Sequence, residues 1–160
     1  MKKKVLSVCC TFLLFFSMLL ISVNDTLAAS DDRILDGSYL THDEESVGYV
    51  TGTTRGVDLL SGYSKCVRLG PGKIYAGGTT IASHDVNCVR VSVLVERAKE
   101  NDSSWDFYDG WYKENENADR VSSNRTLEVE GGYYYRVRSI HSAHLDAGSS
   151  FTNGVYIEKP

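Results

Sequence analysis

The sequence predicts an all-β protein that folds as an antiparallel β-sandwich after an N-terminal signal helix. The more specific prediction is an immunoglobulin-like sandwich. Apolar residues recur at every second position in several short segments, which is the side-chain period of a strand. Turn signals separate these segments about every 8 to 12 residues. No helical stripe of useful length follows the leader, and Tyr, Thr and Val, which favour strands, are frequent.

The first 29 residues are expected to be a secretory signal peptide. Lys2, Lys3 and Lys4 precede an apolar run over 5–23 and a small-residue stretch that ends at Ala29. The run has about 19 residues, close to the roughly 20 that cross a bilayer as a helix, so an uncleaved N-terminal anchor is the alternative. We therefore expect a secreted or extracellular protein that meets a membrane only if the leader is retained.

The charge of the chain after the leader argues against nucleic acid as a partner. Residues 1–29 hold three of the 17 Lys and Arg residues and one of the 21 Asp and Glu residues, which leaves a formal net charge of −6 for the rest. Phosphate backbones attract basic surfaces. The partner is therefore expected to be of another class.

The elements after the leader begin with an acidic stretch. Residues 30–46 have no sustained period and predict a flexible arm, so the sandwich domain is expected over 47–160. Valines at every second position over 89–95 are the strongest strand signal, and Val67 and Leu69 alternate with Cys66 and Arg68 in the same way. Further strands are expected over 73–83, 105–113, 127–129, 133–137 and 155–158.

Two cysteines, Cys66 and Cys88, remain once the leader takes Cys9 and Cys10 with it. Each shares the parity of a neighbouring arginine, which places both on one outward face if their strands are neighbours. An oxidising compartment would then allow a disulfide as a cross-strand staple outside the core. It would close a loop of about 23 residues and contribute roughly 3 kcal/mol. Two unpaired thiols are the alternative.

A tyrosine is expected to hold the corner where the chain passes through Gly131 and Gly132 into its next strand. The spacing from Leu127 to Val137 resembles the strand, turn and strand of immunoglobulin-like sandwiches. In those folds a tyrosine hydroxyl at the corner bonds back to upstream backbone. Tyr135 is the first candidate for this bond, and Tyr133 is the second.

Residue types that carry catalysis do not form a convincing constellation. His141, His144 and Asp146 are close in sequence, but residues three apart on a strand face opposite ways, so neither a metal nor a cofactor is expected. A thiol and base pair of His84 with Cys66 or Cys88 requires that no disulfide forms. The carboxylate pairs Asp106 with Asp109 and Glu114 with Glu116 fit solvated surface charge. We expect a non-enzymatic protein; a secreted hydrolase that uses His141, His144 and Asp146 is the alternative.

Aromatic residues are concentrated over 105–112 and 133–135. Trp105, Phe107 and Trp111 share one parity and are expected in the core. A strand of a two-layer sandwich cannot bury both faces, so some of three tyrosines should stand on the outer surface: Tyr108, Tyr112 and Tyr134. Exposed rings beside carboxylates and amides favour a face that binds a protein or a glycan. The alternative is that these tyrosines merely cover the sheet.

Three short motifs occur along the chain after the leader: Thr54-Arg55-Gly56, Gly70-Pro71-Gly72-Lys73-Ile74, and the segment 89–97 with Trp105 soon after. Together they resemble a family of small secreted proteins of Gram-positive bacteria that is known as a domain of unknown function. The resemblance implies a signal peptide followed by one strand-rich domain of about this length. It implies no activity, cofactor or catalytic residue.

Overall fold

The computed structural model describes residues 33–51 and 56–160. These residues form one mixed sheet without helices, which confirms the predicted all-β class. The expected signal peptide over 1–29, with Cys9 and Cys10, lies outside the described residues. In the part of the chain that is described, no helix has the length and apolarity to cross a membrane. The strands are β1 (Ile34–Leu35), β2 (Ser38–Thr41), β3 (Glu45–Tyr49), β4 (Leu59–Gly70), β5 (Lys73–Ala98), β6 (Asp106–Glu128), β7 (Tyr133–Ala143), β8 (Asp146–Phe151) and β9 (Gly154–Ile157).

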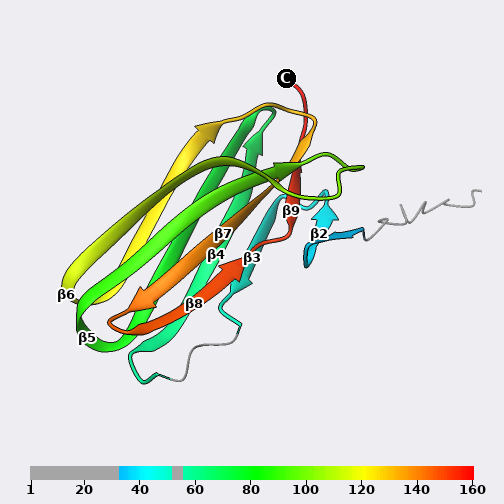
Figure 1. Cartoon of the computed structure of the whole chain (residues 1–160). Helices are drawn as coiled ribbons and strands as arrows, with labels where there is room; N and C mark the ends of the chain where they lie inside the picture. The colour runs from blue at the N-terminus through cyan, green and yellow to red at the C-terminus, as the bar shows by residue number, and fades with distance from the viewer. Residues whose placement is uncertain (1–32, 52–55) are drawn as a thin grey trace, which may run out of the picture. The chain divides into compact units, whose positions relative to one another are not determined.

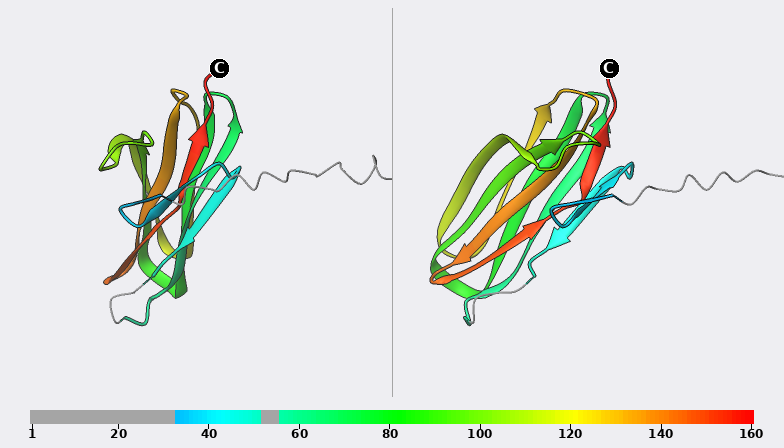
Figure 2. Two further views of the ribbon diagram at one scale, coloured as in Figure 1. Left: turned by 90° about the vertical axis from the view of Figure 1, so that its right-hand side faces the viewer. Right: turned by 45° about the vertical axis from the view of Figure 1, so that its right-hand side comes forward.

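The long strands β5 and β6 belong to both layers of the fold (Figures 1 and 2). Their register shifts between Ile81 and Val86, where a bulge lets the pair bend. The first half of β5 also pairs with β4 and the second half with β7. The sheet therefore curls into a half-barrel whose halves face each other. Because the strands form one sheet and β2 pairs with β9 in parallel, the antiparallel sandwich and its immunoglobulin-like form are not confirmed.

The hydrophobic core lies between the two halves of the curled sheet. The valines of β5 at 89, 91, 93 and 95 are fully buried, as the alternation predicted. Ile74 and Ala76 join them from the first half of β5, and Val137 joins them from β7. Burial of each valine contributes roughly 1.5–3 kcal/mol relative to an exposed side chain. This core fixes the two outer faces on which a ligand can bind.

The tyrosine predicted for the corner before β7 makes the expected bond. The Tyr135 hydroxyl donates to the carbonyl oxygen of Glu130 at 2.8 Å, while the Tyr135 ring is buried and contacts Tyr108 edge-on at 5.4 Å between ring centroids. Burial is the main cause that raises the pKa of Tyr135 to about 12. The phenol therefore stays protonated and remains a donor to the corner.

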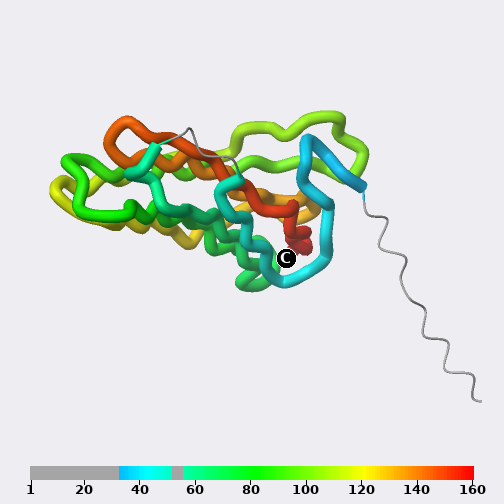
Figure 3. The backbone as a smooth tube through the Cα atoms, turned by 90° about the horizontal axis from the view of Figure 1, so that it is seen from below, coloured from blue at the N-terminus to red at the C-terminus, as the bar shows by residue number. Residues whose placement is uncertain are grey.

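Residues 33–46 include β1, β2 and the first residues of β3, where a flexible arm was expected over 30–46; residues 30–32 lie outside the described part. β1 and β2 form a hairpin through Asp36 and Gly37, both at positive φ, and β2 pairs with β9 beside the C-terminus (Figure 3). Leu35 and Leu40 pack in a second small core with Tyr134. Two buried leucines thus anchor a segment whose acidic composition suggested disorder.

A buried arginine ties this hairpin to the outer side of β7. Arg136 Nη2 donates to the Asp36 carboxylate at 2.7 Å, and Nη1 donates to the carbonyl oxygen of Asp36 and to Ser38 Oγ. Its Nε donates to Glu96 at 2.7 Å, and its guanidinium lies 4.6 Å from the centroid of the Trp105 ring. Hydrogen bonding to Arg136 is the main cause that lowers the pKa of Asp36. The arginine is fully buried, and its Nε, Nη1 and Nη2 atoms each donate a hydrogen bond.

Candidate functional site

The three residues of the alternative hydrolase do not converge. His141 is fully buried between the two halves of the sheet, whereas His144 is exposed in a turn at φ 53°. Asp146 accepts the backbone N–H groups of Asp58 and Leu59 at 2.7 and 3.1 Å. Each side chain therefore has its own surroundings, and no shared site forms among them.

His141 instead stands in a chain of hydroxyl groups inside the core. Its Nδ1 lies 2.9 Å from Thr80 Oγ1 and its Nε2 lies 2.8 Å from Ser150 Oγ. Ser64 Oγ continues the chain, at 2.7 Å from Ser150 Oγ and 2.8 Å from Ser139 Oγ. Burial lowers the pKa of His141 to about 4. A His and Ser at this distance resemble a base and nucleophile, but these side chains are buried, so we assign them a structural role.

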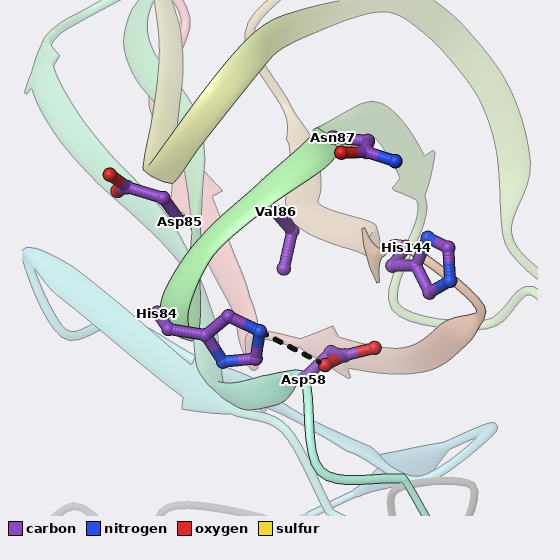
Figure 4. Close-up of a pocket in the computed structure, with 6 residues that line it drawn as sticks. All are labelled: Asp58, His84, Asp85, Val86, Asn87 and His144. Carbon is purple, nitrogen blue, oxygen red and sulfur yellow. Dashed lines mark ion pairs between the residues drawn. The ribbon is translucent and has the colours of Figure 1, made fainter.

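An open cavity of about 380 Å³ lies beside the bend of β5 (Figure 4). His84 Nε2 is 3.4 Å from Asp58 Oδ1, and Asp85 points away from that pair. Over the described ranges no group of three or more His, Cys, Asp or Glu residues could hold a metal ion. The cavity therefore offers one histidine and carboxylate pair on an open surface. Its lining residues are Asp58, His84, Asp85, Val86, Asn87 and His144.

Cys66 and Cys88 are both free thiols, which corrects the predicted disulfide. Cys66 lies opposite Ala76 in the first half of β5, whereas Cys88 belongs to the second half, so the bend separates them into different layers. Cys66 is also buried, with its Sγ 3.6 Å from the carbonyl oxygen of Tyr135, rather than on the outward face. A free cysteine packs as a small apolar residue, so Cys66 occupies an inward position. Side chains alternate along β4, and Val67 and Leu69 therefore take outer positions.

Iodoacetamide is expected to label Cys66 at least about tenfold more slowly than Cys88 in the native protein near pH 8. The thiolate is the reacting species, and burial raises the pKa of the Cys66 thiol to about 12, whereas Cys88 is partly exposed. Peptide mapping by mass spectrometry measures both rates, and labelling in urea is the control. Equal native labelling would contradict the buried position of Cys66.

The three tyrosines predicted for binding have different surroundings. Tyr112 is 66 % exposed on the outer face of β6. Tyr108 is half-buried, and its hydroxyl donates to the carbonyl oxygen of Glu128 at 3.1 Å. Tyr134 is 6 % exposed because the β1–β2 hairpin covers it, which corrects the expectation that it could stand on the surface. A binding role is therefore compatible with Tyr112 and is withdrawn for Tyr134.

A bulge at Tyr108 exchanges the sides of two neighbouring aromatic residues. Val95 lies opposite Asp109 and Glu96 opposite Phe107, so Tyr108 is the extra residue. Side chains alternate along a strand, and one added residue reverses them. Phe107, which was expected in the core, is therefore 66 % exposed, and Tyr108 packs inward on Tyr135. Trp111 and Trp105 are partly buried, as expected for core residues.

The outer side of β6, β5, β7 and β8 carries a surface that we call the apolar face. Ladder partners connect its members: Leu94 lies opposite Arg138, which lies opposite Phe151, and the next row joins Tyr112 to Ile140 through Ser92. Apolar side chains that gather on one exposed face, with polar residues among them, are typical of an interaction site. The face comprises Leu94, Phe107, Tyr112, Ile140 and Phe151, with Arg90 and Arg138 among them.

A cavity of about 490 Å³ opens on the apolar face, where the β1–β2 hairpin stops covering the sheet. Ile140 and Phe151 supply its apolar walls, and Asp36 binds Arg138 Nη2 at 2.9 Å. Arg138 Nε is buried and finds no hydrogen-bond partner among the described residues, although Glu96 Oε2 lies 3.5 Å away. The sequence did not predict this site, because the β1–β2 hairpin that bounds it falls in the segment that was expected to be a flexible arm. The cavity therefore combines apolar walls with the Asp36–Arg138 ion pair.

The resemblance to a family of small secreted bacterial proteins stays a prediction. Part of it rests on Thr54 and Arg55, which lie outside the described residues. The other motifs fall on the turn between β4 and β5 and on the buried half of β5, where they shape the fold. No family model, curated protein or solved structure matches this chain.

Proposed function

We propose that this is an exported, non-enzymatic binding protein whose apolar face binds a segment of another protein. The observation that carries the proposal is the exposed row of apolar side chains that ends in the cavity beside Arg138. Export follows from the predicted leader, and the antiparallel, immunoglobulin-like arrangement of the domain stays a prediction. A membrane association would depend on retention of the leader.

The composition of the apolar face favours a protein segment as its ligand. The centres of protein interfaces are enriched in aromatic residues and arginine and depleted in other charged residues. Phe107, Tyr112 and Phe151 match the aromatic part, and Ile140, 50 % exposed, stands between Tyr112 and the cavity. Arg138 is half-exposed and already donates from Nη2 to Asp36 at 2.9 Å, so a carboxylate of the ligand would share the remaining N–H donors of the guanidinium. The expected ligand therefore places an apolar side chain next to an acidic one.

Substitution Ile140→Asp is expected to weaken binding of such a segment at least about tenfold, because it puts a charge into the apolar centre of the site. Dodecapeptides displayed on phage are selected on the purified protein, and the selected peptides are titrated by fluorescence anisotropy. Selected sequences should combine an apolar residue with Asp or Glu.

The matched control is Leu69→Asp, because Leu69 is also 50 % exposed but lies on the outer face of β4. Its affinity for the selected peptides should equal that of the wild type. The proposal fails if no peptide is enriched above background, or if Ile140→Asp and Leu69→Asp bind equally well.

A further inference from the structure

Three tyrosines lie on the outer side of the opposite half of the sheet, on β3, β4 and β5. Tyr49 lies opposite Tyr63 in the ladder, with 6.1 Å between the ring centroids, and Tyr49 is 65 % exposed. Tyr75 follows on the next strand, opposite Val67. We call this surface the tyrosine face. It is separate from the apolar face, because the core lies between the two halves.

Small neutral groups surround these rings. Gly77 has no side chain, and the hydroxyl oxygen of Tyr75 lies 3.2 Å from the position that a Gly77 Cβ would take, so Tyr75 reaches across it. Thr79 Oγ1 lies 2.9 Å from Ser122 Oγ. Along β6 the outward positions continue as alternate residues with hydroxyl or amide side chains: Ser122, Asn124 and Thr126. The surface thus combines rings with neutral hydrogen-bonding groups.

The charge in the middle of the tyrosine face is balanced. Lys65 lies near both Tyr63 and Tyr75, and its Nζ is 2.8 Å from Glu45 Oε2. The hydrogen bond to Glu45 is the main cause that raises the pKa of Lys65. This pair therefore adds no net charge, although the chain as a whole is acidic. A polyanion or a strongly basic segment gains little from such a surface.

We propose that the tyrosine face binds a neutral polysaccharide built from pyranose rings with equatorial hydroxyl groups. Such a ring has a flat face of C–H groups, which covers a tyrosine ring, and its hydroxyl groups point sideways toward hydrogen-bonding partners. The Tyr49 and Tyr63 ring centroids are 6.1 Å apart, which is on the scale of one sugar unit, and Tyr75 lies opposite Val67, four positions along β4 from Tyr63. The tyrosine face carries a balanced ion pair at its middle and the polysaccharide is neutral, so their electrostatic properties also match. This site is independent of the peptide site proposed above.

Retention on insoluble polysaccharide tests this inference. The purified protein is mixed with microcrystalline cellulose or with chitin, and the bound fraction is measured across a range of polysaccharide amounts. The two polymers distinguish plain glucose units from N-acetylglucosamine units. Wild type is expected to bind at least one of them, and Tyr49→Ala is expected to bind at least about tenfold more weakly. Binding should be unchanged between about 0.1 M and about 1 M salt, because no net charge is involved.

Tyr112→Ala is the matched control, because the exposed fraction of Tyr112, 66 %, is almost the same as the 65 % of Tyr49, but Tyr112 lies on the apolar face. It should bind the polysaccharide as wild type does. Absence of binding to both polymers, equal binding by Tyr49→Ala, or loss of binding at high salt would each overturn the inference. Peptide binding by Tyr49→Ala should be normal, so failure here leaves the proposed peptide site to its own test.

Discussion

Replacement of Arg136 by methionine is expected to lower the free energy of unfolding by about 3 kcal/mol. The guanidinium is buried and holds Glu96, Ser38 and both the carboxylate and the carbonyl oxygen of Asp36. Methionine retains much of the apolar stem but leaves the largely buried Glu96 with only the longer contact to Arg138 Nε at 3.5 Å. The loss lies at the lower end of the range for breaking a buried ion pair, because Asp36 is exposed enough to hydrate. Urea unfolding followed by tryptophan fluorescence measures the change.

Arg138→Met is the matched control for this prediction. Arg138 contacts the same two carboxylates, but its side chain is half-exposed, so the loss should be at most about 1 kcal/mol. Trp105 lies against Arg136, so its fluorescence also reports directly on the release of the hairpin. Equal losses for the two variants would contradict the assignment of Arg136 as the buried centre of the cluster.

The same variant links stability to the proposed binding site. Asp36 and Gly37 form one wall of the cavity on the apolar face, and Arg136 holds them there. If the hairpin separates from the sheet, the cavity loses that wall and Tyr134 becomes exposed. Arg136→Met should therefore also weaken binding of the selected peptides under conditions in which the half-barrel remains folded.

Sequence patterns predicted those parts of the fold that depend on one uninterrupted strand. The valines of β5 over 89–95 have no bulge among them, so their alternation carried over directly into burial. Tyr135 was predicted because its bond partner, Glu130, is only five residues away. In both cases the relevant physical environment lies within a short stretch of chain.

Features that depend on a bulge or on distant partners could not be read in this way. One extra residue at Tyr108 turned Phe107 outward, and the bend in β5 put Cys66 and Cys88 in different layers. The N-terminal hairpin is held by Arg136, which is about 100 residues away and looks like a surface residue in the sequence. The sequence did not predict the tyrosine face, because each of its three rings comes from a different strand.

The burial of His141 had no local signal either, since its partners come from β5 and β8. Gly62 on β4 makes room for it: a Cβ there would lie 2.6 Å from the imidazole Nδ1. Glycine at this position therefore lets the opposite layer approach the ring. The result is a neutral imidazole enclosed by hydroxyl groups, and its burial predicts a dependence of stability on pH.

The free energy of unfolding is expected to fall by about 2 kcal/mol when the pH is lowered from about 7 to about 5. Burial lowers the pKa of His141 to about 4 in the folded protein, whereas the ordinary pKa of a solvated imidazole is about 6.5. Between these values the unfolded chain binds the proton and the folded protein does not, so stability is full above about pH 6.5 and is lost as the pH falls toward 4. Asp36, whose pKa is lowered from 3.8, contributes its own loss at lower pH.

His141→Gln should remove most of this dependence, because its amide can donate to one hydroxyl and accept from the other without titrating. Urea midpoints and slopes at several values between about pH 5 and about pH 7 give the free energy for each variant. His144→Asn is the control, since His144 is exposed and asparagine tolerates its positive φ. This control should keep the wild-type slope with pH. If His141→Gln lost as much stability as the wild type over the same range, the enclosed imidazole would not be the group that titrates.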